Sequence, residues 1–210
     1  MRDGARRLVL ASASPRRAEL LTAAGLTFDV APADLDETPR PGEAPDAYVA
    51  RLAVAKAAAI AAAEPGAVVL AADTTVDVDG EILEKPVDEA DLRRMLGLLS
   101  GRTHRVHTGV AVRSAADGDG EDPVPTKVTT TALTTVVTTT VTFVTLTADD
   151  IDWYVATGDG MGKAGGYGIQ GRAARLVRRV DGSVTNVIGL PLAETIDLLH
   201  RAGLRAPVGR

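Results

Sequence analysis

Cysteine is absent from this chain, so disulfide bonds, thiolate metal sites and a cysteine nucleophile are excluded. Histidine is scarce too, with three in the whole sequence, which leaves little for a histidine-rich metal centre. Any metal ion that binds here is therefore expected to have oxygen ligands.

Long apolar runs and an excess of positive charge are also missing. No stretch approaches the roughly 20 apolar residues of a bilayer-spanning helix, so the sequence predicts a soluble, cytoplasmic protein with no membrane partner. The net charge is −5, whereas surfaces that bind nucleic-acid polymers are usually strongly basic. A nucleic-acid partner is not expected, but a local cluster of positive charge could still bind a small anion.

The chain does contain enough apolar sequence for a substantial core, because 45% of its residues are hydrophobic. The run 67–72 is continuously apolar and predicts a strand that is buried on both faces. Asp73 follows directly, at the expected carboxyl end of this strand. In open α/β sheets ligands bind at that edge, so Asp73 is a candidate site residue.

Asp79 and Gly80 predict the turn of a β-hairpin, since both residue types tolerate the positive φ angles of a type I′ turn. This register places Thr74 opposite Lys85 and makes Asp73 and Lys85 diagonal neighbours, an acid beside a base. The alternative is an exposed hairpin with a surface ion pair that contributes little to stability.

Lys56 falls on the apolar face of a helix predicted over about 46–63. Tyr48, Leu52, Lys56 and Ile60 recur at four-residue intervals, which is the spacing of one helix face. An ammonium turned inward needs a counter-charge or a wet cleft. The alternative is that the lysine side chain extends back to the surface.

Ser14 and Pro15 predict the start of another helix. Arg16 and Arg17 fall in its first turn, where positive charge opposes the helix dipole, and this local cost indicates a bound anion. Free backbone N–H groups, together with Ser12, Ser14 and both arginines, would form a phosphate site. The alternative is a solvated basic helix start.

Two glycine-rich segments follow one another near the end of the chain. The segment 158–164 is one residue shorter than a phosphate-binding P-loop, and Ala164 replaces the required Ser or Thr, so that interpretation is rejected. The segment 165–171 predicts a loop whose backbone approaches a ligand, with Gln170 presenting one donor and one acceptor. The alternative is a plain flexible loop.

The remaining pattern alternates strands and helices. It predicts a strand at 8–11, a helix from Ser14 to about Gly25, a helix at 88–99, a strand at 106–112, a loop at 114–125, a threonine-rich strand at 127–147, a helix capped by Thr147 and Asp150, a second hairpin at 172–188 and a last helix from Pro191.

Several short motifs together carry a family resemblance. They are Leu-Ala-Ser-Ala-Ser-Pro-Arg-Arg from Leu10, Ala-Asp-Thr from Ala72, Lys-Pro at Lys85, Leu-Ser-Gly-Arg-Thr-His from Leu99, and Lys-Ala-Gly-Gly-Tyr-Gly-Ile-Gln-Gly from Lys163. Through these motifs, the chain resembles the Maf-like nucleoside triphosphate pyrophosphatases from about Leu8 to Leu199.

The resemblance implies an α/β fold similar to that of inosine triphosphate pyrophosphatases. An elongated mixed β-sheet flanked by helices would form two lobes around a central cleft, within a single domain over 1–210. The family hydrolyses nucleoside triphosphates between the α and β phosphates with a divalent cation, here Mg²⁺ or Mn²⁺. Relatives often form dimers, so a homodimer is compatible with the resemblance.

Within the family, the run Tyr167 to Gly171 resembles the sequence found in the branch that acts on dTTP and UTP. The substrates implied by this resemblance would also include modified pyrimidine nucleotides. Each would be converted to the monophosphate and diphosphate. The resemblance makes Asp73 the proton acceptor, ties Arg16, Thr74 and Gln170 to base choice, and matches Glu37, Lys56 and Lys85 to the remaining polar residues of the site.

Physical chemistry gives these residues compatible tasks. Asp73 and Glu37 would hold the divalent cation through oxygen, and Asp73 would also activate water if the contact to the metal is water-bridged. Lys56, Lys85 and Arg17 would neutralise the phosphates. The amide of Gln170 can pair with the O4 acceptor and N3–H donor of uracil or thymine.

Two alternatives remain. One is a 7-methyl-GTP pyrophosphatase of the same family, against which Gln170 argues. The other is a nucleotide-binding regulator of cell division and septum formation, which would need to bind phosphate but would not need Asp73.

Overall fold

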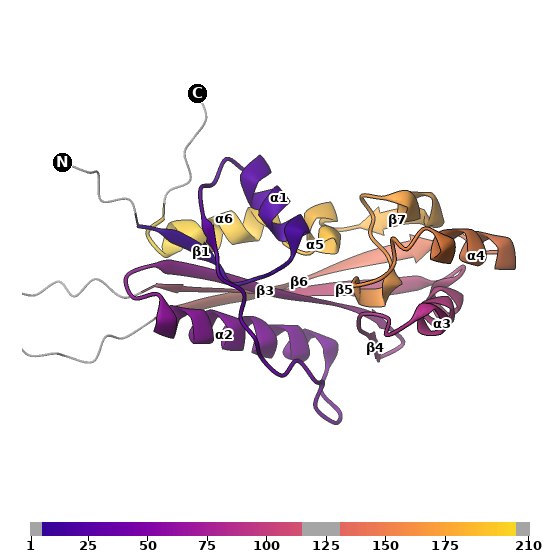
Figure 1. Ribbon diagram of the computed structural model, residues 1–210, viewed down its shortest axis with the longest axis horizontal. Coiled ribbons are helices and arrows are strands. Elements are labelled where there is room, and N and C mark those ends of the chain that lie inside the picture. Colours follow the sequence, from indigo (N-terminus) through magenta and orange to yellow (C-terminus); the bar gives the residue numbers. More distant parts are fainter. Residues whose placement is uncertain (1–5, 115–130, 205–210) are drawn as a thin grey trace, which may run out of the picture.

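The computed structural model describes residues 6–114 and 131–204, which form one mixed seven-stranded β-sheet with helices on both faces (Figure 1). The strand order is β2-β1-β3-β5-β6-β7, and β4 pairs with β3 beside this path. Strand β1 is parallel to β2 and β3, and the other pairs are antiparallel. The strands are β1 (Leu8–Leu10), β2 (Asp29–Val30), β3 (Val68–Val78), β4 (Glu81–Leu83), β5 (Thr103–Ser114), β6 (Thr131–Phe143) and β7 (Val177–Asp181).

The helices divide between the two faces of the sheet. The longest, α2, lies along one face of β3 and β5, while α1, α5 and α6 lie on the opposite side (Figure 1). Their bounds are α1 (Pro15–Ala23), α2 (Pro45–Ala63), α3 (Glu89–Leu99), α4 (Ala148–Ala156), α5 (Val184–Ile188) and α6 (Leu192–Arg201), with 3₁₀ turns η1 (Ala164–Gly166) and η2 (Arg172–Leu176). The predicted α/β class, with an elongated mixed sheet and flanking helices, is confirmed.

The apolar core is divided along the long strands. At one end Val76, Leu92 and Phe143 belong to a cluster between the sheet, α3 and α4. At the other end Leu10 and Leu190 belong to a cluster that includes residues of α1 and α6. Strand β3 contributes to both clusters, so its middle part lies between them.

Helix α2 approaches the sheet very closely at Gly109 of β5. A Cβ atom at this position would lie 2.4 Å from the carbonyl oxygen of Val49 and 2.8 Å from the backbone nitrogen of Ala50. Real Cβ atoms do not make such contacts with backbone, so glycine is required for this approach. The contact fixes the depth at which α2 presents its side chains to β3 and β5.

Several local predictions are confirmed. The carboxylate of Asp88 caps α3 by accepting a hydrogen bond from the backbone nitrogen of Asp91 at 2.8 Å. Thr147 and Asp150 form the capping box of α4. The threonine-rich segment is a strand that pairs with β5 in one unbroken register from Thr131 to Thr142, although it ends at Phe143 and not at the predicted Thr147. Of the predicted loop at 114–125, Ser114 is the last residue of β5 and the rest lies outside the described residues, as does the predicted strand start at 127–130.

The predicted second hairpin at 172–188 is wrong. Its first part is the 3₁₀ turn η2 followed by β7, which pairs with β6, and its second part is the helix α5. Ser183 explains the difference, because its hydroxyl caps α5 by accepting a hydrogen bond from the backbone nitrogen of Asn186 at 3.2 Å. The turn at Asp181 and Gly182 therefore leads into a helix instead of a second strand.

Within the described ranges, no helix is both long enough and apolar enough to cross a bilayer.

Candidate active site

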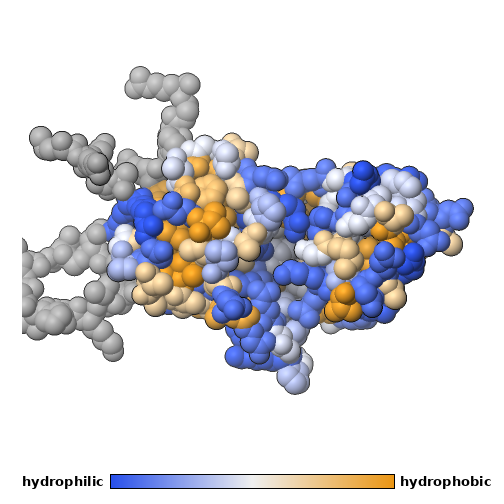
Figure 2. Space-filling model, viewed as in Figure 1, coloured by the Kyte–Doolittle hydropathy of each residue, from blue (hydrophilic) through white to orange (hydrophobic). Residues whose placement is uncertain are grey.

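A cleft of about 690 Å³ opens over the middle of β3. The surface is hollowed between the two ends of the molecule, and the rim of the hollow is largely hydrophilic (Figure 2). Every residue that the sequence analysis proposed for the site lines this cleft: Ser12, Ser14, Arg16, Arg17, Glu37, Lys56, Asp73, Thr74, Lys85 and Gln170. They come from segments far apart in the sequence.

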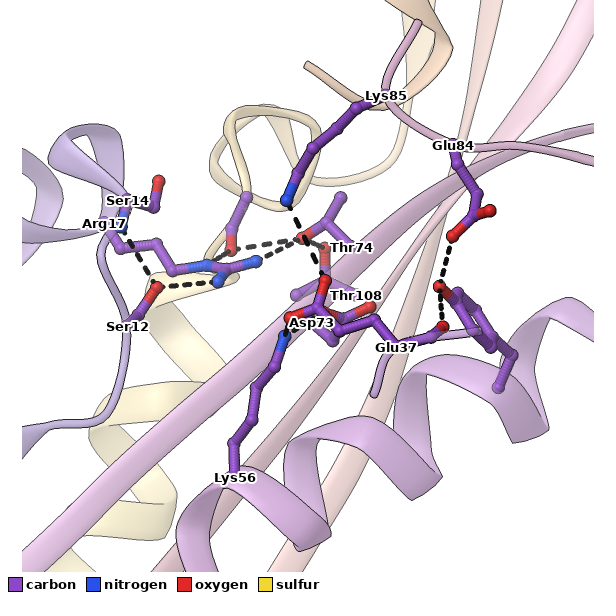
Figure 3. Close-up of polar contacts among 12 residues, drawn as sticks. Ser12, Ser14, Arg17, Glu37, Lys56, Asp73, Thr74, Glu84, Lys85 and Thr108 are labelled. Atoms are coloured by element: carbon purple, nitrogen blue, oxygen red, sulfur yellow. Dashed lines mark hydrogen bonds and ion pairs between the residues drawn. The ribbon is translucent and has the colours of Figure 1, made fainter. Parts of the chain in front are cut away.

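Lys56 joins two carboxylates on the floor of the cleft (Figure 3). Its Nζ lies 2.5 Å from Oδ1 of Asp73 and 2.6 Å from Oε1 of Glu37. The side chains of Lys56 and Asp73 are only 8% and 10% exposed, whereas that of Glu37 is 37% exposed. The expectation that an inward lysine must find a counter-charge is confirmed.

The position of Asp73 differs from the prediction. Strand β3 does not end at residue 72 but continues to Val78, so Asp73 lies in the middle of the strand, opposite Gly109 of β5. The strand continues because the following side chains, such as Val76, pack into the core cluster that also contains Leu92 and Phe143. Since α2 passes so close to Gly109, Lys56 of α2 reaches the carboxylate of Asp73, which lies opposite Gly109.

The predicted hairpin is confirmed in its turn and register, but its pairing ends before Lys85. The hairpin turns as expected, with positive φ angles at Asp79 and Gly80, but β4 ends at Leu83, opposite Val76. The pair between Thr74 and Lys85 is therefore not formed. The cause is Pro86, which lacks a backbone donor and restricts the residue before it.

Lys85 instead faces Glu37, with its Nζ 3.8 Å from Oε2 of that carboxylate. Burial raises the pKa of Glu37, but the hydrogen bond and charge of Lys56, with the charges of Lys85 and Arg17, hold it below its ordinary value overall. Glu37 is therefore ionised at neutral pH, and each of its oxygens faces a lysine.

Arg17 is buried at the wall of the cleft and is oriented by three protein acceptors. Its Nε donates to the carbonyl oxygen of Gly189 at 2.8 Å, one terminal nitrogen donates to Oγ of Ser12 at 2.9 Å, and the other donates to Oγ1 of Thr74 at 3.1 Å. Burial lowers the pKa of Arg17, and the charge of Asp73 partly offsets this effect. Two of the five guanidinium N–H groups remain outside these contacts.

Thr74 links this arginine to the sheet. Its hydroxyl lies 2.9 Å from the hydroxyl of Thr108 on β5, whose own Oγ1 lies 3.2 Å from the carbonyl oxygen of Asn186 in α5. Neither Thr108 nor Asn186 was expected at the site from the sequence. Their side chains are separated from the site motifs in the sequence, and only the pairing of β3 with β5 brings Thr108 beside Thr74.

Ser14 occupies the N-cap of α1 as expected, but its side chain makes no capping hydrogen bond. Its backbone nitrogen donates instead to Oγ of Ser12 at 3.3 Å. Arg16 lines the cleft beside this turn, and burial lowers its pKa. The start of α1 thus presents a hydroxyl and a guanidinium to the cleft.

The glycine-rich loop forms the opposite wall, where Lys163 and Gln170 line the cleft. Lys163 donates to the carbonyl oxygen of Asp159, and burial and the nearby charge of Arg16 lower its pKa. Lys163 belongs to one of the family motifs, but no pattern in the sequence assigned it a task. Gln170 is exposed at the third position of a turn that the hydrogen bond from Gly171 to Gly168 closes at 3.0 Å.

Tyr48 is a second residue that the sequence analysis assigned only to the apolar face of α2. Its hydroxyl lies 2.8 Å from Oε1 of Glu84 and 2.9 Å from the carbonyl oxygen of Glu37. It therefore connects the two irregular segments that carry Glu37 and Lys85. No sequence pattern distinguishes this tyrosine from an ordinary core residue.

The fold and the cleft define an α/β protein with an acidic pair on the cleft floor and basic side chains on its walls, an arrangement suited to a polyphosphate. The chain matches the family model described as Maf-like protein over residues 7–202. It therefore belongs to the Maf-like protein family, and the resemblance inferred from the motifs is confirmed.

Curated relatives match over nearly their whole length. The chain is 53% identical over 201 residues to a dTTP/UTP pyrophosphatase of Anaeromyxobacter dehalogenans, which covers 96% of both chains. It is 51% identical over 200 residues to a dTTP/UTP pyrophosphatase of Myxococcus xanthus, covering 95% of this chain and 94% of the relative. A protein of the same name from Sphingopyxis alaskensis is 54% identical over 203 residues, covering 96% and 98%.

Proposed function

We propose that this protein is a nucleoside triphosphate pyrophosphatase that hydrolyses dTTP and UTP to the monophosphate and diphosphate. The observation that carries the proposal is the buried contact of Lys56 with Asp73 and Glu37 at the floor of a cleft whose walls present further cations. Relatives named dTTP/UTP pyrophosphatase, about half identical to the whole chain, support it.

The acidic pair fits a divalent cation that the substrate helps to hold. Lys56 contacts one oxygen of each carboxylate, so the second oxygen of Asp73 lies outside these contacts and that of Glu37 lies 3.8 Å from Nζ of Lys85. In the described part of the chain no group of three or more acidic or histidine side chains could hold a metal ion. This agrees with Mg²⁺ or Mn²⁺ bound by one or two carboxylates plus substrate phosphates. When bound, such an ion neutralises phosphate charge and makes a coordinated water more acidic.

The basic side chains orient the triphosphate. Arg17 directs its two remaining N–H groups from a fixed position, and Lys85 and Arg16 add charge from the rim. Because these groups are held before the substrate arrives, little reorganisation is needed when negative charge develops on the leaving diphosphate.

Asp73 is the base in this proposal. Its buried carboxylate is fixed by Lys56, and it would accept a proton from the water that attacks between the α and β phosphates. Lys56 holds the carboxylate of Asp73 in place for this proton transfer through its contact at 2.5 Å.

Gln170 selects the base in this proposal. Its amide faces the cleft from the loop opposite α1, and it can donate to O4 and accept from N3–H of uracil or thymine. Cytosine presents the reverse pattern on this edge and pairs with Gln170 only after the amide rotates by half a turn, so this residue discriminates against CTP imperfectly. The same edge of uracil and thymine accounts for acceptance of both dTTP and UTP.

The test is diphosphate release from dTTP, UTP, CTP, GTP and 7-methyl-GTP with Mg²⁺, with Mn²⁺ and with a chelator. Wild-type protein is expected to release diphosphate from dTTP and UTP only when a divalent cation is present. Asp73→Asn, which keeps the shape of the side chain, is expected to lose at least about 100-fold in kcat while it still binds nucleotide. Asp152→Asn, in an exposed ion pair on α4, is the matched control.

Other outcomes separate the alternatives. Release from 7-methyl-GTP in place of dTTP and UTP would transfer the protein to the other branch of the family. Nucleotide binding with no release from any substrate would favour the regulator, and an Asp73→Asn variant with full activity would refute the role of Asp73.

A further inference from the structure

One family motif has no part in the cleft. No residue of the segment Leu99-Ser100-Gly101-Arg102-Thr103-His104 lines it, although the segment helped to identify the family. It connects α3 to β5, and its last residue, His104, is 2% exposed. A buried polar side chain at this position calls for a specific partner.

The partner of His104 is Tyr167 of the glycine-rich loop. Nε2 of His104 lies 2.8 Å from the hydroxyl oxygen of Tyr167, and both groups are buried. The two rings meet edge to face with centroids 5.4 Å apart, and Phe143 of β6 packs edge to face against each of them at 5.0 and 4.9 Å. The hydroxyl and the ring of Tyr167 are therefore both fixed from the sheet.

Tyr167 is in turn connected to the residue that faces the base. Directly after it begins the turn 168–171, in which Gln170 occupies the third position. Before it, the backbone nitrogen of Gly165 donates to the carbonyl oxygen of Glu84 at 3.0 Å. Gln170 itself is exposed, and its side chain has no hydrogen-bond partner among the described residues, so the turn sets the backbone position from which its amide extends.

We propose that His104 is a positioning residue for base selection, which acts through its hydrogen bond to Tyr167 and thereby sets the location of Gln170. The inference rests on the proposed function, since it assumes that Gln170 contacts the pyrimidine. It assigns a task to a motif that touches neither the substrate nor the acidic pair.

The strength of the effect follows from the type of bond. Burial lowers the pKa of His104 to about 4, with the charge of Asp77 acting in the opposite direction, so the ring is neutral at pH 7. The bond to Tyr167 is then one between two neutral groups. Losing such a bond typically corresponds to a factor of about 3 to 10 in an equilibrium.

The test compares kcat/KM for UTP with kcat/KM for CTP in Tyr167→Phe and His104→Phe. Both substitutions keep an aromatic ring and remove the hydrogen bond. The preference for UTP over CTP depends on the amide orientation of Gln170 that pairs with uracil, and a displaced Gln170 loses that pairing, so the UTP to CTP ratio is expected to fall by up to about 3- to 10-fold. The ratio does not depend on the fraction of folded protein, because both substrates are measured on the same sample.

The controls separate positioning from general stability. Thr195→Val removes another buried neutral hydrogen bond, from Oγ1 to the carbonyl oxygen of Pro191 at 2.7 Å, and should leave the ratio unchanged. His104→Gln restores a donor and acceptor and should recover part of the ratio. The double variant of His104 and Tyr167 should lose no more than either single variant, because both remove the same bond.

Each result has a definite meaning. An unchanged ratio in Tyr167→Phe and His104→Phe, with wild-type turnover of UTP, refutes the positioning role and leaves the proposed function intact. An equal fall in Thr195→Val also refutes it. Absence of UTP turnover in the wild-type protein instead refutes the proposed function.

Discussion

Lys56→Met removes the ammonium that joins Asp73 to Glu37 and replaces it with a side chain of similar length. The carboxylate of Asp73, which is 10% exposed, then loses its contact at 2.5 Å and faces the charge of Glu37. Loss of one partner from a buried ion pair typically costs about 3 to 5 kcal/mol. Because Glu37 is 37% exposed and water reaches the cleft, we expect the lower end of this range.

The assay is thermal and urea unfolding of Lys56→Met beside wild type. A loss of about 3 kcal/mol corresponds to a fall in Tm of roughly 6 to 12 °C for a protein of this size. Arg93→Met is the control, since Arg93 contacts two carboxylates with a side chain that is 44% exposed and should cost less than about 1 kcal/mol. Equal Tm values for Lys56→Met and Arg93→Met would refute the reasoning.

The pH dependence gives a second criterion for Lys56→Met. In the wild-type fold the pKa of Glu37 is held below its ordinary value, so its contribution to stability is present above the unfolded-state pKa of about 4.3 and is lost as pH falls through the folded value. Lys56→Met lacks the main cause of this depression. The gap in stability between the two proteins should therefore be full at neutral pH and close below about pH 4, and a gap that widens on acidification would contradict the electrostatic explanation.

Two further predictions concern positions outside the acidic pair. Gly109→Ala should destabilise the folded protein by about 3 kcal/mol or more and lower its activity, because the new Cβ would lie 2.4 Å from a backbone oxygen of α2. The control is Gly97→Ala in α3, where the new Cβ would meet no atom within 4 Å and stability should be unchanged or higher. Urea unfolding of both variants tests the close approach of α2 to β5. Burial lowers the pKa of His104 from 6.5 to about 4, so its neutral form favours folding, and this part of the stability declines as pH falls from 6.5 to 4, by up to about 3 kcal/mol. The free energy of unfolding should change less with pH across this window in His104→Phe than in wild type. Identical pH dependence in the two proteins would contradict a buried, neutral His104.

Helix α2 shows how far sequence reasoning extends. The four-residue spacing of Tyr48, Leu52 and Lys56 was sufficient to place a lysine on an inward face and to require a counter-charge. The spacing could not predict which carboxylate would pair with Lys56. That depended on the approach of α2 to β5 at Gly109, which is a contact between distant segments.

The two predicted hairpins show the opposite limit. The turn at Asp79 and Gly80 was correct because a type I′ turn is a local conformation of two residues. The length of β4 was not, since Pro86 ends the pairing before Lys85. At 172–188 the Asp-Gly signal was the same, but the cap formed by Ser183 produced a helix.

The sequence by itself determined the fold class, the family and many of the polar residues that line the cleft, because motifs and periodicities are properties of neighbouring residues. Only the tertiary structure decided the pairings: Lys56 with Asp73 and Glu37, Arg17 with Ser12 and Thr74, and His104 with Tyr167. These contacts join residues up to 63 positions apart in the chain. Their partners are selected by strand register and helix packing, and neither is encoded within a single segment.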